Sequence, residues 1–446
     1  MIGRYKAYPE YKESGVVWLG EIPVDWNVIP LKYLAALTPK KSGINKKKKS
    51  EHCSFIPMEK LKLNSLKLDE TKLISEVYDG YTYFENEDVL IAKVTPCFEN
   101  KNMAVAKNLI NGIGFGSSEI YVLRTNSKLN NQFLFYRLQE DSFMEIATAA
   151  MSGAGGLKRV PAEVINTFLA AFPSYEEQQK IVNFLDHETA KIDTLIAKQE
   201  KLIELLKEKR QAVISHAVTK GLNPNAPMKY SGVEWLGEVP EHWDLKRFKH
   251  LFKIRKRIAG KTGFDILSIT QKGIKVKDIT SGEGQLSMDY SKYQLVYQGD
   301  YAMNHMDLLT GFVDISNYDG VTSPDYRVFT LEHKMSESSY YLRLLQMGYL
   351  DKLFYPLGQG AAHIGRWRLP TEAFNEFLAP CPPYEEQKEI SHFVNKTHNQ
   401  IDALLGKAES AINLMKERKT ALISATVTGK IDVRNWRPQS EDLSED

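Results

Sequence analysis

The residues that could do chemistry are few, and none completes a catalytic or metal-binding pattern. Gly260, Lys261 and Thr262 match the end of a phosphate-binding loop. That loop requires a glycine five residues before Gly260, and the chain has Arg255 there. The ten histidines include no His-x-x-x-His or His-Glu-x-x-His pair, so the sequence predicts no metal site.

One tetrapeptide, Cys381-Pro-Pro-Tyr384, resembles the Asp/Asn-Pro-Pro-Tyr motif of adenine methyltransferases. A cysteine replaces the acid or amide that would hold the target amine. The corresponding segment in the first half of the chain reads Phe172-Pro-Ser-Tyr175, which also lacks that group. We therefore interpret both segments as turns that lead into a helix. A DNA methyltransferase that works alone stays an alternative with weak support.

An internal repeat organises the chain. Residues 14–26 and 231–243 share nine of 13 positions, including Trp26 and Trp243. A second block, 175–219, shares 20 of 45 positions with 384–428. The order is a short block, a long variable region and a long block, and this order occurs twice. A constant frame around variable inserts is typical of a recognition module.

The long blocks are predicted to be helices, because their apolar residues follow one another at steps of three and four. A lone amphipathic helix of this length would leave its apolar face in water, so we expect the two helices to pack on each other. We favour an antiparallel pair, because the repeat then closes on itself, and a parallel pair with the variable regions side by side stays the alternative. At 1.5 Å per residue, each helix of ~40 residues is roughly 60 Å long. The predicted packing residues are Ile181, Phe184, Ile192, Leu195 and Ile203 in the first helix, and Ile390, Phe393, Ile401, Leu404 and Ile412 in the second.

The variable regions combine strand and helix signals. Segments 83–94, 120–124, 293–304 and 326–332 are rich in β-branched and aromatic residues and predict strands. Segments 130–150 and 338–355 predict helices. Residues 116–123 match 322–329 in pattern, and Arg159-Val-Pro161 matches Arg368-Leu-Pro370. The two regions are therefore expected to share a fold and differ in surface.

Basic residues give the positive functional signal, although the net charge of the 446-residue chain is only +2. Local basic clusters attract phosphates, and arginine can bind guanine bidentately. The candidate DNA-binding residues lie in two basic runs and behind two Gly-rich loops. They are Lys40, Lys41, Lys46 and Lys47; Lys253, Arg255, Lys256, Arg257 and Lys261; and Lys158, Arg159, Arg366 and Arg368. Solvated surface charge, or an ion pair within the chain, is the competing interpretation of each.

These features together resemble the specificity subunit of type I restriction–modification systems. The resemblance rests on the twin Trp segments at 14–26 and 231–243, the Pro-x-Tyr-Glu-Glu-Gln helix starts at 173 and 382, and the Lys-Glu-(Lys/Arg)-(Arg/Lys) stretch near each helix end. It covers the whole chain. Pro-Ser-Tyr and Pro-Pro-Tyr replace the family's usual Pro-Pro-Leu, and the second copy has no equivalent of the lysine run at 46–49.

The resemblance implies an α+β chain with two mixed α/β target-recognition domains, joined by two long antiparallel helices in a coiled coil with pseudo-two-fold symmetry. It implies the following boundaries: an N-terminal segment and first recognition domain (1–172), a first helix (173–220), a linker with the second Trp segment and second domain (221–381), a second helix (382–429) and a tail (430–446). Each domain would read one half of a bipartite DNA site, and the helices would set the spacing.

The resemblance also implies partners. These are double-stranded DNA, two methyltransferase (modification) subunits and, as optional members, two restriction (motor-nuclease) subunits. The chain itself would be non-catalytic and hold no cofactor, since S-adenosylmethionine, ATP and Mg²⁺ belong to the partners. The remaining alternative is a coiled-coil scaffold that does not read DNA.

The composition suggests a cytoplasmic location. No apolar run reaches the ~18–20 residues that span a bilayer, and the first residues lack the apolar core of a signal peptide. Three cysteines far apart in the sequence argue against a disulfide framework.

Overall fold

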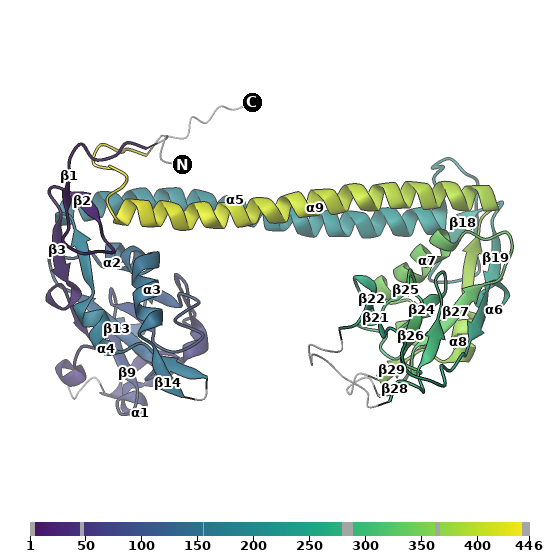
Figure 1. Ribbon diagram of the computed structural model, residues 1–446, viewed down its shortest axis with the longest axis horizontal. Coiled ribbons are helices and arrows are strands. Elements are labelled where there is room, and N and C mark those ends of the chain that lie inside the picture. The colour runs from purple at the N-terminus through teal and green to yellow at the C-terminus, as the bar shows by residue number, and fades with distance from the viewer. Residues whose placement is uncertain (1–4, 45–48, 155, 279–288, 362–365, 439–446) are drawn as a thin grey trace. The chain divides into compact units, whose positions relative to one another are not determined.

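The computed structural model describes residues 5–44, 49–154, 156–278, 289–361 and 366–438 (Figure 1). The chain divides into two compact units. Unit 1 comprises residues 1–199 and 410–446, and unit 2 comprises residues 200–409. Each unit holds one variable region and one half of each long helix. Among the described residues, no helix is long and apolar enough to cross a membrane.

Unit 1 contains many short strands around a buried core, with small helices on the sheets. Its strands are β1 Tyr11–Glu13, β2 Glu21–Pro23, β3 Asn27–Pro30, β4 Ala35–Leu37, β5 His52–Ile56, β6 Leu61–Lys62, β7 Ser65–Leu66, β8 Thr71–Leu73, β9 Thr82–Glu85, β10 Val89–Ala92, β11 Met103–Val105, β12 Ile113–Gly116, β13 Ile120–Thr125, β14 Ser152–Ala154, β15 Leu157–Arg159 and β16 Leu169–Phe172. Its short helices are α1 Ile74–Val77, α2 Asn131–Arg137, α3 Asp141–Ala149 and α4 Ala162–Thr167.

Unit 2 is built in the same way. Its strands are β17 Met228–Tyr230, β18 Glu238–Pro240, β19 Asp244–Arg247, β20 Phe252–Arg255, β21 Leu267–Thr270, β22 Gly273–Val276, β23 Gln294–Val296, β24 Tyr301–Met303, β25 Val313–Ile315, β26 Gly320–Thr322, β27 Arg327–Leu331, β28 Gln359–Ala361, β29 Arg366–Arg368 and β30 Leu378–Cys381. Its short helices are α6 Phe248–Leu251, α7 Ser338–Leu350 and α8 Thr371–Glu376.

The central sheets of the two units have the same topology. Unit 1 has the antiparallel order β11-β10-β13-β4, and unit 2 has β25-β24-β27-β20. In unit 1, β10 pairs with its hairpin partner β11 on one side and with β13 on the other. In unit 2, β24 pairs with its hairpin partner β25 and with β27 in the same way. The predicted mixed fold is therefore confirmed, including strands within all four predicted strand segments. The predicted helix 130–150 is two helices, since Glu140 has an extended backbone and caps α3.

The long helices are α5 Tyr175–Lys220 and α9 Tyr384–Val427. Within unit 1, the first half of α5 lies beside the last half of α9, and Lys419 Nζ is 2.7 Å from the Asp193 carboxylate. Within unit 2, the last half of α5 lies beside the first half of α9, and Arg210 Nη1 is 2.6 Å from Asp402 Oδ1. The pairing is antiparallel in both, as predicted.

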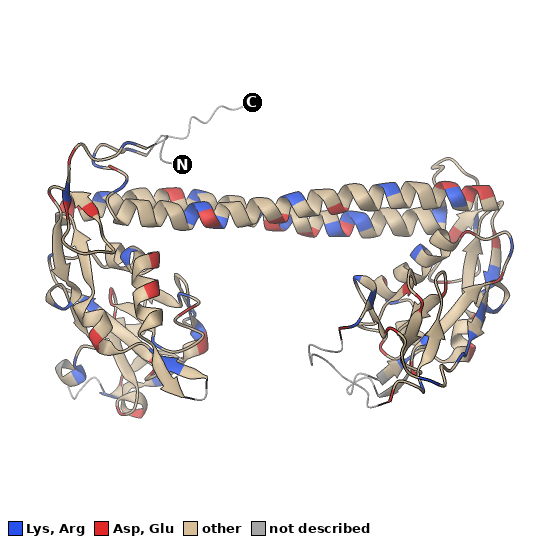
Figure 2. Cartoon of the chain, in the orientation of Figure 1, with Lys and Arg blue, Asp and Glu red and all other residues tan. Residues whose placement is uncertain are grey.

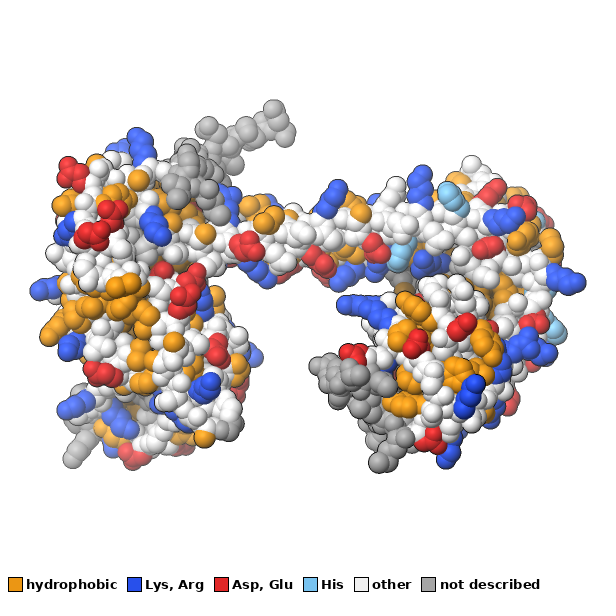
Figure 3. All heavy atoms as spheres, viewed as in Figure 1, with side chains coloured by type: hydrophobic (Ala, Val, Ile, Leu, Met, Phe, Trp, Pro, Cys, Tyr) orange, Lys and Arg blue, Asp and Glu red, His pale blue; other side chains and the backbone are white. Residues whose placement is uncertain are grey.

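The helix stripes are buried to different extents. Ile181, Phe184, Ile192, Ile390, Ile401 and Ile412 are buried, and Ile203 is half-buried. The structure instead exposes Leu195, Phe393 and Leu404, whose exposed fractions are 46%, 39% and 48%. Two helices in contact bury only a narrow strip, so residues at the edge of a broad apolar stripe stay at the surface. Figure 3 shows hydrophobic side chains among charged ones on the visible face of the helices.

The Glu-Glu-Gln motif at each helix start attaches the helix to its unit. The indole Nε1 of Trp26 donates to Glu177 Oε1 at 3.1 Å, and that of Trp243 donates to Glu386 Oε2 at the same distance. Both indoles are fully buried. In each unit, the short repeated block is thus joined to the long one by an indole–carboxylate hydrogen bond, and in unit 2 His242 Nε2 also lies 2.8 Å from Glu386 Oε2.

The glutamine of the motif binds backbone atoms only. Gln178, 1% exposed, accepts from the amide of Asn130 at 2.8 Å and donates to the carbonyls of Lys128 and Pro173 at 3.0 Å. Gln387 is fully buried and repeats the pattern with the Glu337 amide and the Met335 and Pro382 carbonyls. We call this arrangement the glutamine clamp. It joins the helix start to the loop that begins α2 or α7.

Replacing Gln178 by alanine should destabilise the chain by about 2–4 kcal/mol, because the backbone groups of Asn130, Lys128 and Pro173 lose their hydrogen-bond partner. Urea unfolding monitored by far-UV circular dichroism measures the loss. The matched control is Glu176→Gln, a change at an exposed side chain of the same motif. Equal midpoints for the two variants would contradict a stabilising role for the clamp.

Candidate nucleic-acid interface

The first basic run lies in unit 1, before β5. Lys40 is exposed. Lys41 donates to the backbone carbonyl of Tyr78, and its ammonium is 5.0 Å from the centre of the Tyr78 ring. Lys49 also lies over this ring, at 4.0 Å. Lys46 and Lys47 lie outside the described residues. Lys41 and Lys49 therefore lie together over the ring of Tyr78.

The second basic run lies at β20 and after it, and it divides by residue type. Arg255 donates from Nε to Thr330 Oγ1 at 2.9 Å and also pairs with Glu332. Arg257 pairs with Asp300. The lysines Lys253, Lys256 and Lys261 are exposed, and Lys261 lies 5.6 Å from the Phe264 ring centre. The arginines are thus engaged within unit 2, while the lysines point to solvent.

Arg257 neutralises a buried carboxylate. Its Nη2 is 2.6 Å from Oδ2 of Asp300, which is 5% exposed. Unit 1 has the same arrangement at the start of β10, where Arg124 Nε and Nη2 hold both oxygens of Asp88 at 2.8 and 2.7 Å. A buried carboxylate without a cation is strongly unfavourable. The ion pair therefore gives Arg257 a structural role that does not depend on DNA binding.

Two small hairpins carry the candidates behind the Gly-rich loops. In β14-β15 of unit 1, Lys158 is exposed, and Arg159 forms a bidentate pair with Glu119 at 3.0 and 2.8 Å. In β28-β29 of unit 2, Arg368 is exposed, and the side chain of Arg366 lies outside the described part of the structure. Figure 2 shows that Lys and Arg alternate with Asp and Glu over each unit, so charge alone does not mark one face.

Beside the second hairpin, unit 2 holds a cluster of polar groups that sequence reasoning did not select. Arg327 is 5% exposed and donates from Nη2 to the Leu369 carbonyl at 3.0 Å. Asn304 Oδ1, His305 Nδ1 and Arg327 Nη1 are buried and have no hydrogen-bond partner within the described ranges. Burial, followed by the positive charges of Arg327 and Arg368, lowers the pKa of His305 to about 3.

The pattern match between 116–123 and 322–329 contained a signal for this cluster. It aligns Tyr121 with Arg327 and Glu119 with Asp325, at the starts of β13 and β27. The residues of this cluster come from separate segments of the sequence, whereas each basic run is contiguous and can be recognised from composition. No group of three or more His, Cys, Asp or Glu in the described part of the chain could hold a metal ion.

Comparison with known proteins agrees with this architecture. A family model described as "Type I restriction modification DNA specificity domain" matches residues 23–205. The specificity subunit of the type I restriction enzyme EcoAI of Escherichia coli is 35% identical over 187 residues, which are 41% of this chain and 30% of that protein. The MjaVIII specificity subunit of Methanocaldococcus jannaschii is 24% identical over 400 residues, covering 81% of this chain and 89% of that protein.

Over residues 23–205 the chain is similar to the DNA specificity domain of type I restriction–modification systems. The matched region is less than a third of the EcoAI and EcoEI subunits, at 30% and 27% of their lengths.

Solved structures support the fold. A chain from a study of complex assembly and conformational transition of the type I R-M system superposes with a TM-score of 0.70, at 15% identity, and covers 92% of this chain and 99% of that one. The HsdS subunit from Thermoanaerobacter tengcongensis gives a TM-score of 0.54 at 14% identity, with 92% and 98% covered.

Acidification should destabilise this chain through His305. An unfolded histidine titrates near 6.5, and the folded pKa of His305 is about 3. Between these values the unfolded chain binds a proton that the folded chain does not. Stability is therefore present above pH 6.5 and falls as the pH decreases towards 3.

The difference in unfolding free energy between pH 7 and pH 4.5 should shrink in His305→Gln, which cannot titrate. Urea titrations at both pH values measure this difference. His250→Gln, at an exposed histidine of unit 2, is the control and should retain the wild-type difference. If His305→Gln also retains it, His305 is not the group that makes unit 2 sensitive to acid.

Proposed function

We propose that this chain is a type I specificity subunit and reads a bipartite DNA site, one half-site with each unit. The observation that carries the proposal is the pair of central sheets with one topology and different surfaces, each fixed to the repeated frame by the same clamp. Two readers of one sequence would need one surface. Two diverged surfaces on one frame suit two different half-sites.

The long helices are proposed to set the gap between the half-sites. Each of α5 and α9 begins in one unit and ends in the other, and they contain 46 and 44 residues. An α-helix rises 1.5 Å per residue and resists bending, so a pair of them acts as a spacer of defined length. B-DNA repeats every ~34 Å, and a fixed spacer selects half-sites at a matching number of turns.

Affinity is proposed to come from exposed lysines, and sequence choice from other side chains. Lys40, Lys158, Lys253, Lys256 and Lys261 extend into solvent. Phosphate contacts of this kind position a protein on DNA without reading its sequence. They also make binding sensitive to salt.

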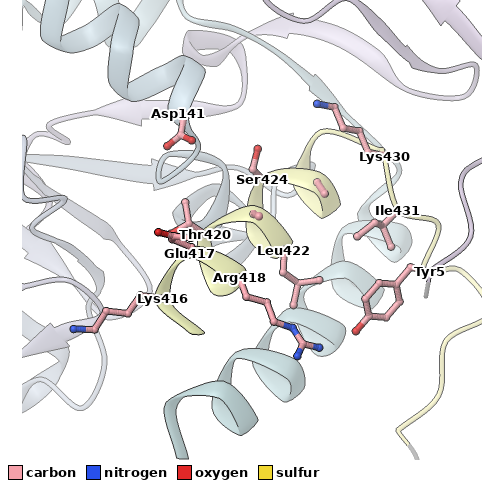
Figure 4. Close-up of a pocket in the computed structure, with 12 residues that line it drawn as sticks. Tyr5, Asp141, Lys416, Glu417, Arg418, Thr420, Leu422, Ser424, Lys430 and Ile431 are labelled. Atoms are coloured by element: carbon pink, nitrogen blue, oxygen red, sulfur yellow. The ribbon is translucent and has the colours of Figure 1, made fainter. Parts of the chain in front are cut away.

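The methyltransferase subunits are proposed to dock in two equivalent grooves, one in each unit. A groove of ≈ 830 Å³ in unit 1 is lined mainly by α9, including Lys416, Glu417 and Thr420 (Figure 4). A groove of ≈ 830 Å³ in unit 2 is lined by Lys207, Glu208 and other residues. The two Lys-Glu pairs occupy the same position of the repeated helix.

A site that occurs twice on one chain fits two copies of one partner. Those partners would supply the chemistry, so we assign S-adenosylmethionine to the methyltransferase subunits, and ATP and Mg²⁺ to the motor-nuclease subunits.

Filling the unit 1 groove should remove one methyltransferase subunit from the complex. Thr420→Trp places an indole among the lining residues, because Thr420 is exposed there. Native mass spectrometry of the reconstituted complex should then give one methyltransferase subunit per chain in place of two. Thr194→Trp, at an exposed threonine of α5 that does not line the groove, is the control. Two bound subunits in Thr420→Trp would place the docking site elsewhere.

The reconstituted complex should select a bipartite motif from random duplexes. We expect two short specified segments separated by unspecified base pairs, because only the two units touch base edges. Sequencing of bound duplexes measures the motif. A single contiguous motif would contradict the two-reader proposal. Equal binding of all duplexes would favour a scaffold that does not read DNA, and S-adenosylmethionine binding by the isolated chain would favour a methyltransferase.

A further inference from the structure

The strand register identifies one equivalent position in the two units, where the end of the central strand meets the small hairpin. In unit 1, the backbone carbonyl of Lys93 accepts from the Val160 amide at 2.9 Å, and the Thr95 amide donates to the Lys158 carbonyl at 3.1 Å. In unit 2, the backbone carbonyl of His305 accepts from the Leu369 amide at 2.9 Å. We call these places junction 1 and junction 2.

The same backbone carbonyl is held in both junctions, but by different side chains. The hydroxyl of Tyr121 donates to the Val160 carbonyl at 2.9 Å, and Arg327 donates to the Leu369 carbonyl at 3.0 Å. Tyr121 pairs with Ile91, and Arg327 pairs with Met303, at equivalent positions of the two sheets. The backbone is therefore conserved between the units, while the side chains that surround it have been replaced.

Junction 1 presents a carboxylate. Glu119 receives both donors of Arg159 at 3.0 and 2.8 Å, and Lys93 Nζ is 3.8 Å away. Both cations keep the pKa of Glu119 low, with the hydrogen bond from Arg159 as the largest favourable cause. The side chain of Glu119 is 28% exposed, so an ionised acceptor is fixed in orientation and remains open to solvent.

Junction 2 presents donors. Arg368 stands where junction 1 has Arg159, and Asp325 stands where junction 1 has Glu119. Within the described residues, no ion pair joins Arg368 to Asp325, and both side chains are exposed. Arg327 and His305 lie beside it, with buried atoms that have no partner in the described ranges. The guanidinium of Arg368 is therefore available to an outside acceptor.

We propose that the two junctions are the specificity-determining positions of the two units. Arg368 of junction 2 reads a guanine, and Glu119 of junction 1, positioned by Arg159, reads a base amino group of cytosine or adenine. This assignment rests on the proposed function, because it presumes that each unit meets a DNA half-site.

The chemistry follows from what each group can pair with in the major groove. Guanine shows two acceptors there, O6 and N7, which match the fork of an arginine. Cytosine N4 and adenine N6 are donors, which match a carboxylate. Because the guanidinium of Arg159 binds both oxygens of Glu119, it is less available to a guanine than the guanidinium of Arg368. The two junctions would thus read different bases from the same backbone position.

The test is selection from random duplexes by the complex of the full chain with its methyltransferase subunits. Arg368→Ala should lose the preference for guanine at one position of one half-site, with discrimination there falling roughly 10–100-fold. Glu119→Gln should change one position of the other half-site only. Lys256→Ala, an exposed lysine of unit 2 outside the junction, should weaken binding to all duplexes and leave the motif unchanged.

The outcomes separate the two proposals. If the wild-type complex selects a bipartite motif and both variants select the same motif, the junction assignment is wrong and the two-reader proposal stands. A half-site without guanine at the affected position also overturns the assignment. If the wild-type complex shows no preference, the proposed function itself fails. Arg368→Lys keeps the charge, and should retain affinity but lose discrimination, which distinguishes base reading from damage to the fold.

Discussion

The glutamine clamp is the constraint on which the arrangement of this chain depends. Gln178 and Gln387 are buried at the starts of the two long helices, and each amide group binds backbone atoms on both sides. Loss of a hydrogen bond from a buried amide costs free energy of folding. The loop before α2 or α7 is therefore held next to the start of the long helix. The neighbouring glutamate holds a buried tryptophan from the other repeated block. The same short motif therefore attaches the variable region to a long helix in each unit.

This constraint explains how a copied frame can carry diverged inserts. The clamp contacts the backbone of the variable region, at residues 128 and 130 in unit 1 and at 335 and 337 in unit 2. Backbone groups are the same for every residue type except proline at the donor position. The side chains around them can therefore change without loss of the attachment. The attachment depends on side chains of the frame and on backbone groups of the variable region, so the repeated residues lie in the frame.

The sequence predicted what depends on local pattern and on the repeat. The two long helices, their pairing and the strands of the central sheets follow from periodicity and from two matching blocks. Periodicity does not tell the middle of an apolar stripe from its edge, so Leu195 and Leu404 were grouped with residues that are buried. A basic run does not reveal its partners either. Asp300 and Glu332, which pair with Arg257 and Arg255, lie 43 and 77 residues away.

Arginine and lysine have different structural roles on the surfaces of the two units. Arg124 and Arg257 neutralise buried carboxylates, whereas Lys253 and Lys256 extend into solvent. A guanidinium gives several fixed donors and suits a defined geometry, while an ammonium on a flexible stem acts as a point charge. Exposed lysines can therefore serve any phosphate, and an arginine becomes selective only where nothing in the fold occupies it. Arg368 meets that condition in unit 2, and Arg159 does not in unit 1, because Glu119 already binds it. The sequence divergence of the two units thus changes which group is free to bind an outside partner, without changing the backbone that carries it.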